Sequence, residues 1–193
     1  MNITTRQLEL IEAACRILTR SGVTGLTIKN LAKEMNFSES AIYRHFTSKE
    51  EIVIAMLQYL AGNTEERLAN LPYYDQPEDN FKEMFREQFR FFKNNTHFIV
   101  TVFSDGLMEE SRLINLEIKK LMATKIKYLM KIIQDGQQKK VFCTSIATED
   151  LAYIVMGTFK LQMFKWRLSN FDYDISEVGE KMISSLLTVI KNR

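Results

Sequence analysis

The chain has 193 residues, and its 26 basic and 24 acidic residues give a formal net charge of +2. An apolar fraction of 46%, with only 2 prolines and 7 glycines, predicts a folded and mainly helical protein and excludes disorder. Two cysteines and two histidines are too few for a disulfide framework or a Cys/His metal site, so we expect no metal and no cofactor.

The first predicted helix spans about residues 5–20 and ends before Gly22, a residue type common at helix ends. Its apolar residues recur at the spacing of one helical face and are Leu8, Ile11, Ala14, Cys15 and Leu18. This pattern predicts an amphipathic helix that buries one side.

The segment LTIKNLAKEMNFSESAIYRHFTSKE, residues 26–50, predicts two short helices joined by a tight turn. Thr27 and Ser38 are suited to cap the two helices. Asn36 tolerates the left-handed conformation that a turn between them needs, and we expect Phe37 to be a buried plug. Ile42 and Phe46 would point back to the core, which leaves the other faces of a two-turn helix exposed. The arrangement favours a helix-turn-helix whose second helix enters the DNA major groove.

The same region resembles the DNA-binding domain of the TetR family of bacterial transcriptional regulators. The matching residues are Gly25-Leu26-Thr27, Leu31-Ala32, Tyr43-x-His45-Phe46, Ser48-Lys49-Glu50 and, upstream, Ile11-x-x-Ala14-Cys15-x-x-Leu18 followed by Gly22. Asn36 departs from the glycine that many members carry, which is a mild chemical change. The remaining two thirds of the chain resembles the family in length and helical pattern only.

This resemblance implies phosphate contacts from Thr27, Tyr43, His45 and Lys49. Reading of base edges would fall to other exposed positions, and the full predicted set adds Lys29, Ser38, Glu39, Ser40, Ala41 and Arg44. Tyr43 could instead be a packing residue. Because the net charge is small, the DNA-binding prediction rests on where these residues stand.

Beyond this module, Ser48-Lys49-Glu50-Glu51 predicts a capping box that opens a connector helix over 48–68. A loop over 72–80 follows, then helices rich in phenylalanine to about Ser104, a long helix over 111–135 that stops at Gly136, and two last helices over 150–168 and from about 175. We therefore expect an all-α fold of about nine helices. Residues 1–47 would be the helix-turn-helix domain, and residues 48–193 a helical domain for effector binding and dimerisation.

The last two helices predict a homodimer interface, because the first is apolar nearly all round and the second carries a long apolar seam. The predicted interface residues are Leu151, Val155, Ile175, Val178, Gly179, Met182, Ile183, Leu186, Leu187 and Ile190. The alternative is that these residues pack within one chain. The TetR resemblance favours the dimer, since members commonly dimerise through their last two helices.

A dense aromatic and methionine set in the second domain predicts a pocket for a small apolar or amphipathic effector, acyl or aromatic. Its residues are Phe85, Phe89, Phe92, Phe103, Met108, Met122, Phe159, Met163 and Trp166, with Gln88, Tyr128 and Gln162 as polar anchors. Taken singly, each of these residues is more typical of an ordinary core.

The sequence thus predicts a TetR-like, sequence-specific transcriptional regulator, a homodimeric repressor on a palindromic operator that releases DNA when its effector binds. The alternative is a helical interaction or structural protein without DNA switching. We find no Gly-rich phosphate loop, zinc motif or catalytic triad, and therefore predict no enzyme and no catalytic residue. The sequence has neither a signal peptide nor a long apolar segment, so we expect a cytoplasmic protein without membrane contact.

Overall fold

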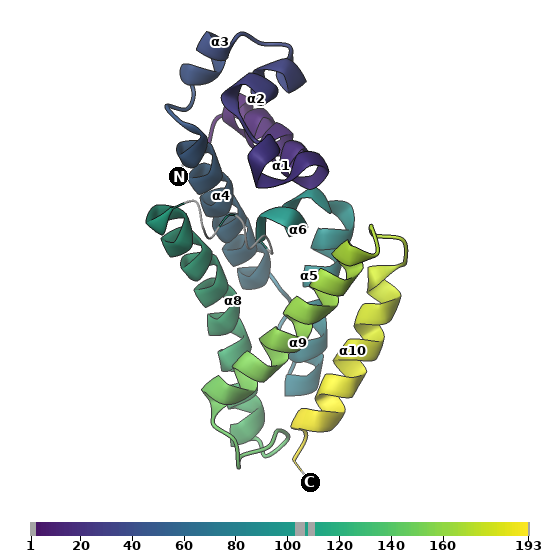
Figure 1. The fold of residues 1–193 in the computed structure, drawn as a ribbon. Coiled ribbons are helices and arrows are strands. Elements are labelled where there is room, and N and C mark those ends of the chain that lie inside the picture. The colour runs from purple at the N-terminus through teal and green to yellow at the C-terminus, as the bar shows by residue number, and fades with distance from the viewer. Residues whose placement is uncertain (1–2, 103–106, 108–110, 193) are drawn as a thin grey trace. The chain divides into compact units, whose positions relative to one another are not determined.

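A computed structural model of the protein describes residues 3–102, 107 and 111–192 (Figure 1). The described residues form nine helices, and outside them Phe142 and Lys191 form an isolated antiparallel bridge. The helices are α1 (Thr5–Gly25), α2 (Ile28–Met35), α3 (Glu39–Tyr43), α4 (Lys49–Ala69), α5 (Pro77–Asn94), α6 (His97–Val102), α8 (Arg112–Gln138), α9 (Thr148–Leu168) and α10 (Ile175–Ile190). The predicted all-α fold class is confirmed.

The chain forms two compact units. The first comprises Met1–Asn63 and His97–Leu121, and the second comprises Thr64–Thr96 and Met122–Arg193. Helices α4 and α8 each contribute residues to both units. The domain boundary expected after residue 47 divides the chain by function rather than by packing, and it stays a prediction.

In the first unit, α1 opens with a capping box in which Thr4 and Gln7 satisfy each other's backbone N–H groups. The sequence predicted that this helix ends before Gly22, but α1 continues to Gly25 and is only interrupted at Gly22, whose φ of 67° is accessible to glycine at little cost. The apolar face of α1 packs against α2 and α6. Its buried residues are Leu10, Ile11, Ala13, Ala14, Cys15, Ile17 and Leu18.

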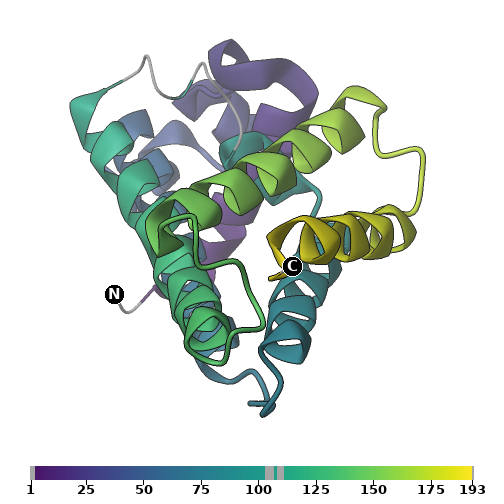
Figure 2. The ribbon, with the colours of Figure 1, turned by 90° about the horizontal axis from the view of Figure 1, so that it is seen from below.

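In the second unit, α10 packs mainly against α5, and Figure 2 shows the two helices side by side. Gly179 makes this approach possible, because a Cβ atom there would lie only 2.5 Å from Cδ2 of the buried Phe89. Phe159 of α9 fills the centre, with its ring 5.6 Å from that of Phe85 and 5.3 Å from that of Phe89. These contacts form a continuous aromatic core.

Three further helix ends differ from the prediction. Helix α5 begins at Pro77, inside the expected loop, because proline lacks the N–H that the first helical turn leaves unbonded. Helix α8 passes through Gly136 to Gln138, and the glycine is needed for packing, since a Cβ there would lie 2.1 Å from the Phe142 ring. Helix α9 begins at Thr148. The end expected for the sixth helix, near Ser104, lies outside the described residues.

Within the described ranges, every helix is either too short or too polar to span a bilayer.

Candidate DNA interface and effector site

The helix-turn-helix is built from local hydrogen bonds. The Thr27 hydroxyl accepts a hydrogen bond from the Asn30 backbone N–H at 3.1 Å and caps α2. Asn36 ends α2 in the left-handed conformation, with φ 54° and ψ 42°. The Ser38 hydroxyl then accepts from the Ala41 N–H at 3.2 Å and caps α3. The predicted caps and turn are all confirmed.

Apolar side chains hold α3 in place. Ile42 of α3 and Phe46 just beyond it are buried, together with Leu31 and Ala32 of α2. A five-residue helix is too short to be stable alone, so this burial fixes its orientation. The prediction that Phe37 is fully buried is wrong: its ring is half-buried, with the Arg6 guanidinium 5.2 Å from the ring centroid, because the turn leaves it near the surface.

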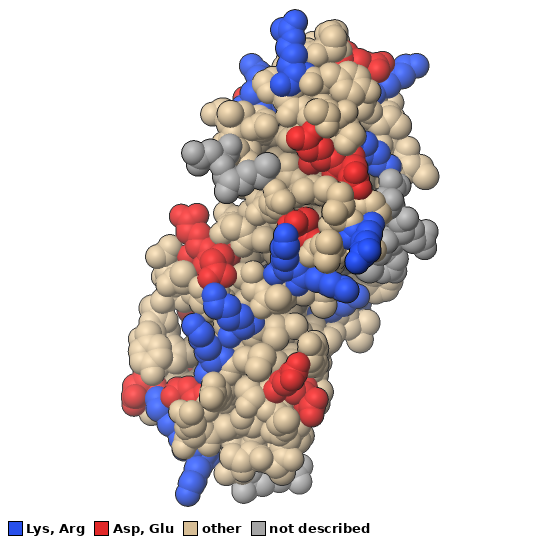
Figure 3. Space-filling view, turned by 90° about the vertical axis from the view of Figure 1, so that its left-hand side faces the viewer, with Lys and Arg blue, Asp and Glu red and all other residues tan. Residues whose placement is uncertain are grey.

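The outer face of this module presents the predicted DNA-binding residues to solvent. Seven of them are exposed, namely Thr27, Lys29, Ser38, Glu39, Ser40, Tyr43 and Arg44, and three are half-buried, namely Ala41, His45 and Lys49. The Tyr43 side chain is 51% exposed, which argues against a packing role. Basic and acidic side chains both project at the end of the first unit that carries α2 and α3 (Figure 3), as expected from the small net charge.

The start of α4 is held to the rest of the module. The Lys49 ammonium donates a hydrogen bond to the Val23 carbonyl oxygen at 3.3 Å, near the end of α1. The Glu51 N–H bonds to the Ser48 hydroxyl at 3.1 Å, as predicted. The Glu51 carboxylate, however, accepts from the backbone and hydroxyl of Thr47, and these bonds hold the pKa of Glu51 below its ordinary value. The capping box therefore closes one residue earlier than expected.

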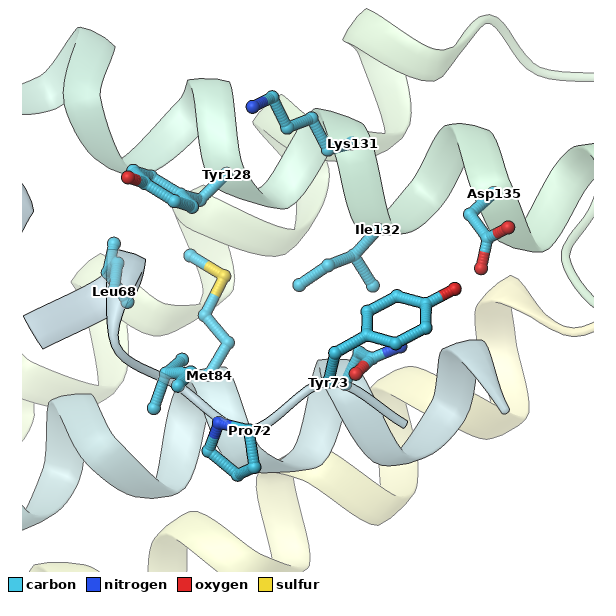
Figure 4. A pocket seen from close by; sticks show the side chains of 10 residues that line it. Leu68, Pro72, Tyr73, Met84, Tyr128, Lys131, Ile132 and Asp135 are labelled. Carbon is cyan, nitrogen blue, oxygen red and sulfur yellow. The ribbon is translucent and has the colours of Figure 1, made fainter. Parts of the chain in front are cut away.

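The second unit contains a cavity of about 230 Å³ between α4, α5 and α8 (Figure 4). Leu68, Met84 and Tyr128 lie at one end of it, and Tyr73 and Asp135 lie at the other. The complete lining is Leu68, Leu71, Pro72, Tyr73, Asn80, Met84, Tyr128, Lys131, Ile132 and Asp135. Of the predicted pocket residues that the structure describes, only Tyr128 belongs to it. The other lining residues were not predicted, because about half of the wall comes from the loop after α4 and from the last turns of α8.

Most of the predicted pocket aromatics form core instead. Phe85, Phe89, Phe92, Phe159, Met163 and Trp166 are buried. The Trp166 indole N–H bonds to the Tyr173 carbonyl at 2.8 Å, and the Gln162 amide bonds to the Tyr173 hydroxyl at 3.1 Å, so Gln162 is occupied within the chain. The side chain of Met122, also a predicted pocket residue, is exposed. Phe103 and Met108 lie outside the described residues.

Two buried polar side chains stand among these rings. Gln88, a predicted anchor, is 1% exposed, and both polar atoms of its amide lack a hydrogen-bond partner among the described residues. Lys125 was missed. It is 4% exposed, and its ammonium lies 4.8 Å from the ring centroid of Phe92 and 5.7 Å from that of Phe159. Burial, and then the charge of Arg67, lower the pKa of Lys125 to about 7.

The sequence did carry a signal for Lys125. It stands four residues after Leu121 and four before Leu129, both buried, and therefore on the inward stripe of α8. A lysine at such a position either reaches solvent or is enclosed, and sequence alone does not distinguish the two.

The predicted dimer-interface residues pack within the single chain. Leu151, Val155, Ile175, Gly179, Met182, Ile183, Leu186, Leu187 and Ile190 are buried there, and Val178 is half-buried. Because α5 packs against α10, the single chain already buries this seam, and the role of these residues in a contact with a second chain stays a prediction. The apolar residues that remain exposed on these helices are Tyr153, Ile154, Leu161, Phe164 and Leu168 of α9 and Val189 of α10.

A capped, anchored α3 with a solvent-facing outer surface is the arrangement found in helix-turn-helix DNA-binding domains. Residues 10–56 match the family model described as "Bacterial regulatory proteins, tetR family". Residues 77–165 match the model described as "Tetracyclin repressor-like, C-terminal domain". Together these ranges cover more than half of the chain. The chain belongs to the TetR family.

Individual relatives agree with this assignment. The chain is 30% identical over 110 residues to YerO, an uncharacterised HTH-type transcriptional regulator of Bacillus subtilis (strain 168). The aligned segment covers 53% of this chain and only 37% of that relative. The fold of the present chain is similar to that of the fatty acid degradation regulator FadR from Bacillus halodurans, with a TM-score of 0.84 and 18% identity over 97% of each chain. FadR from Bacillus subtilis in complex with stearoyl-CoA gives a TM-score of 0.80 and 16% identity over 95% of this chain and 98% of that one.

Proposed function

We propose that this protein is a sequence-specific transcriptional repressor, not an enzyme, that binds a palindromic operator as a homodimer in the cytoplasm and releases it when an acyl effector binds. The observation that carries the proposal is the outer face of the helix-turn-helix. Local caps and buried apolar side chains fix α3, and its remaining side chains are left to solvent.

The exposed residues supply both kinds of group that operator recognition needs. Thr27, Tyr43 and Lys49 offer hydroxyl and ammonium donors to phosphates, which position the protein without reading sequence. Arg44 can donate two hydrogen bonds to guanine, and Glu39 can accept one from cytosine. The Lys49 ammonium also donates a hydrogen bond to the Val23 carbonyl, which holds it beside the end of α1.

The homodimer would form through the exposed apolar side of α9. Tyr153, Ile154, Leu161 and Leu168 are each about half exposed or more, and monomeric proteins rarely leave such residues together on one helix. A two-fold contact would cover this face and hold two copies of α3 about 34–36 Å apart, the separation of successive major grooves.

The effector would bind in the second unit. The proposal of an acyl ligand is supported by the cavity between α4, α5 and α8 and by the stearoyl-CoA complex of the Bacillus subtilis FadR, whose fold is similar. A coupling free energy of about 1–3 kcal/mol between the two sites would lower operator affinity by roughly 5- to 150-fold.

A binding scan tests the proposal. A preferred site is first selected from random duplexes with the full chain, and fluorescence anisotropy then measures the affinity for that site and for its single-base variants at one fixed salt concentration. Tyr43→Phe should weaken binding to all duplexes by a similar factor. Arg44→Ala should relax the preference at one position in each half-site, at a cost of about 1–3 kcal/mol. Lys119→Ala, on the exposed face of α8, is the control and should change neither.

The alternative function, a helical interaction protein without DNA switching, predicts no selected sequence. If the full chain shows the same affinity for selected and random duplexes, the repressor proposal is wrong and that alternative gains support. Selection of a site, with the position-specific effect confined to Arg44→Ala, excludes it.

A further inference from the structure

Three helices of the second unit place a buried polar side chain one turn away from the cavity wall. On α4, Thr64 lies one turn from Leu68 of the cavity wall, and on α5, Gln88 lies one turn from Met84. On α8, Lys125 lies one turn from Tyr128. Residues three or four positions apart share one face of a helix, so each pair does so. Thr64, Gln88 and Lys125 are all nearly inaccessible. These three residues, which we call the polar centre, therefore lie one helical turn beyond Leu68, Met84 and Tyr128, which stand at one end of the cavity in Figure 4.

Gln88 at this centre has no partner for either end of its amide among the described residues. A buried amide without hydrogen bonds is strongly disfavoured, and natural cores almost always satisfy such groups. Its neighbours one turn away on α5 are Phe85 and Phe92, which offer no acceptor or donor. The amide is therefore arranged for a polar group that comes from outside the chain.

Lys125 adds a positive charge that the chain does not balance. Within the described residues it pairs with no carboxylate, and the charged group that acts on it is Arg67 of α4, which is also positive. Arg67 is itself paired with Glu87 of α5 at 3.2 Å. On its other sides, the ammonium meets the rings of Phe92 from α5 and Phe159 from α9. A negatively charged group would supply the partner that the protonated form of Lys125 lacks among the described residues.

The cavity offers an apolar approach to this centre. Leu68, Leu71, Pro72 and Ile132 line it, and the unbranched Met84 side chain can change rotamer at little cost. Lys131 and Asp135 also line the cavity; Asp135 forms an ion pair with Lys139 at 3.2 Å, although its buried Oδ2 lacks a hydrogen-bond partner among the described residues. A ligand that enters with its polar end first would therefore be held by the centre, with its apolar chain in the cavity.

We propose that the effector is a free carboxylic acid with an apolar chain, whose carboxylate is bound by the Lys125 ammonium and the Gln88 amide N–H. The inference rests on the proposed effector binding in this unit and adds the chemical class of the ligand. The three N–H donors of Lys125 are enough for the carboxylate and for Oε1 of Gln88, so every polar atom of the centre would be satisfied.

Calorimetric titration of the full chain with three probes of equal chain length tests this proposal: sodium decanoate, 1-decanol and decanoyl-CoA. The wild-type chain should bind decanoate about tenfold or more tightly than 1-decanol, since a hydrogen-bonded charge pair discriminates by at least that factor. Lys125→Met should abolish this preference, and Gln88→Leu should reduce it. Both variants remove a buried polar group and should fold. Lys119→Met, exposed on α8, is the matched control and should retain the preference.

Three outcomes would overturn the inference: equal affinity for decanoate and 1-decanol, a preference that survives Lys125→Met, or tight binding of decanoyl-CoA alone. Failure of all three probes to bind the wild-type chain also rejects the proposed ligand class. Operator binding is measured separately with each probe. If decanoate binds through Lys125 but the operator stays bound, the switching mechanism is refuted and the binding site is kept. If decanoyl-CoA alone releases the operator, the switching mechanism is kept and the carboxylate site is refuted.

Discussion

Lys125→Met should stabilise the ligand-free protein, because it removes a buried charge and keeps an unbranched apolar chain of similar length. Burial and the charge of Arg67 lower the pKa of Lys125 from its ordinary 10.5 to about 7. At 1.36 kcal/mol per pKa unit, this difference corresponds to a penalty of about 5 kcal/mol when the lysine is protonated in both states. At neutral pH most of this penalty remains, so we expect the variant to gain about 4 kcal/mol in the free energy of unfolding.

The gain should depend on pH in a defined direction. Below about pH 7 the folded and unfolded chains both hold the proton, and the penalty is complete. Between about pH 7 and 10.5 the unfolded chain binds a proton that the folded chain does not, so the stability of the wild-type protein rises with pH. The advantage of the variant should therefore shrink across this window and vanish near its upper end.

Urea unfolding followed by helical circular dichroism, at one fixed protein concentration and at several pH values from about 6 to 10, measures this difference. Lys119→Met, which removes an exposed lysine from the same helix, is the control and should track the wild-type protein throughout. A gap between Lys125→Met and the wild type that stays constant with pH would refute the reasoning, because it would show that Lys125 keeps its ordinary pKa in the folded state.

Three further predictions concern packing, capping and assembly. Gly179→Ala places a Cβ 2.5 Å from the enclosed Phe89 ring and should lower the free energy of unfolding in urea by about 1–3 kcal/mol. The control Gly62→Ala, with nothing within 4 Å of its Cβ, should be neutral or stabilising. Equal effects of the two substitutions would contradict the close contact between α5 and α10. Ser38→Ala removes the cap of α3 and should lower stability by about 1 kcal/mol and weaken operator binding, while Ser38→Thr should preserve both; an unchanged thermal midpoint and affinity in Ser38→Ala would show that burial alone holds the helix. Leu161→Lys should shift the sedimentation coefficient from dimer to monomer without loss of helical signal, and a persistent dimer would move the interface away from α9.

Local sequence was enough to predict the helix-turn-helix. Each of its determinants acts over a few residues: Thr27 and Ser38 bond the backbone three positions ahead, and Asn36 adopts the left-handed turn with its own backbone. Interactions of this range depend little on the rest of the chain. For the same reason the break at Gly22 was predictable, although the continuation of the helix to Gly25 was not. The residue spacing alone indicated that Ile42 and Phe46 face inward.

The proposed effector site was only partly predictable. The pattern of α8 put Lys125 on the inward face, and Gln88 was identified as a polar residue among phenylalanines. Their lack of partners depends on which groups α4 and α9 bring close, and those helices are distant in sequence. The cavity was missed for the same reason, since its wall combines the ends of α4 and α8 with the loop between α4 and α5.

The seam of α10 shows the division most clearly. Its apolar spacing and Gly179 determined that another helix must approach closely, and this much followed from sequence alone. A stripe of apolar residues does not specify its partner, because burial rewards any apolar surface of suitable shape. Only the tertiary structure decided that α5, with Phe89 against Gly179, occupies the seam, and that apolar residues on one side of α9 stay exposed.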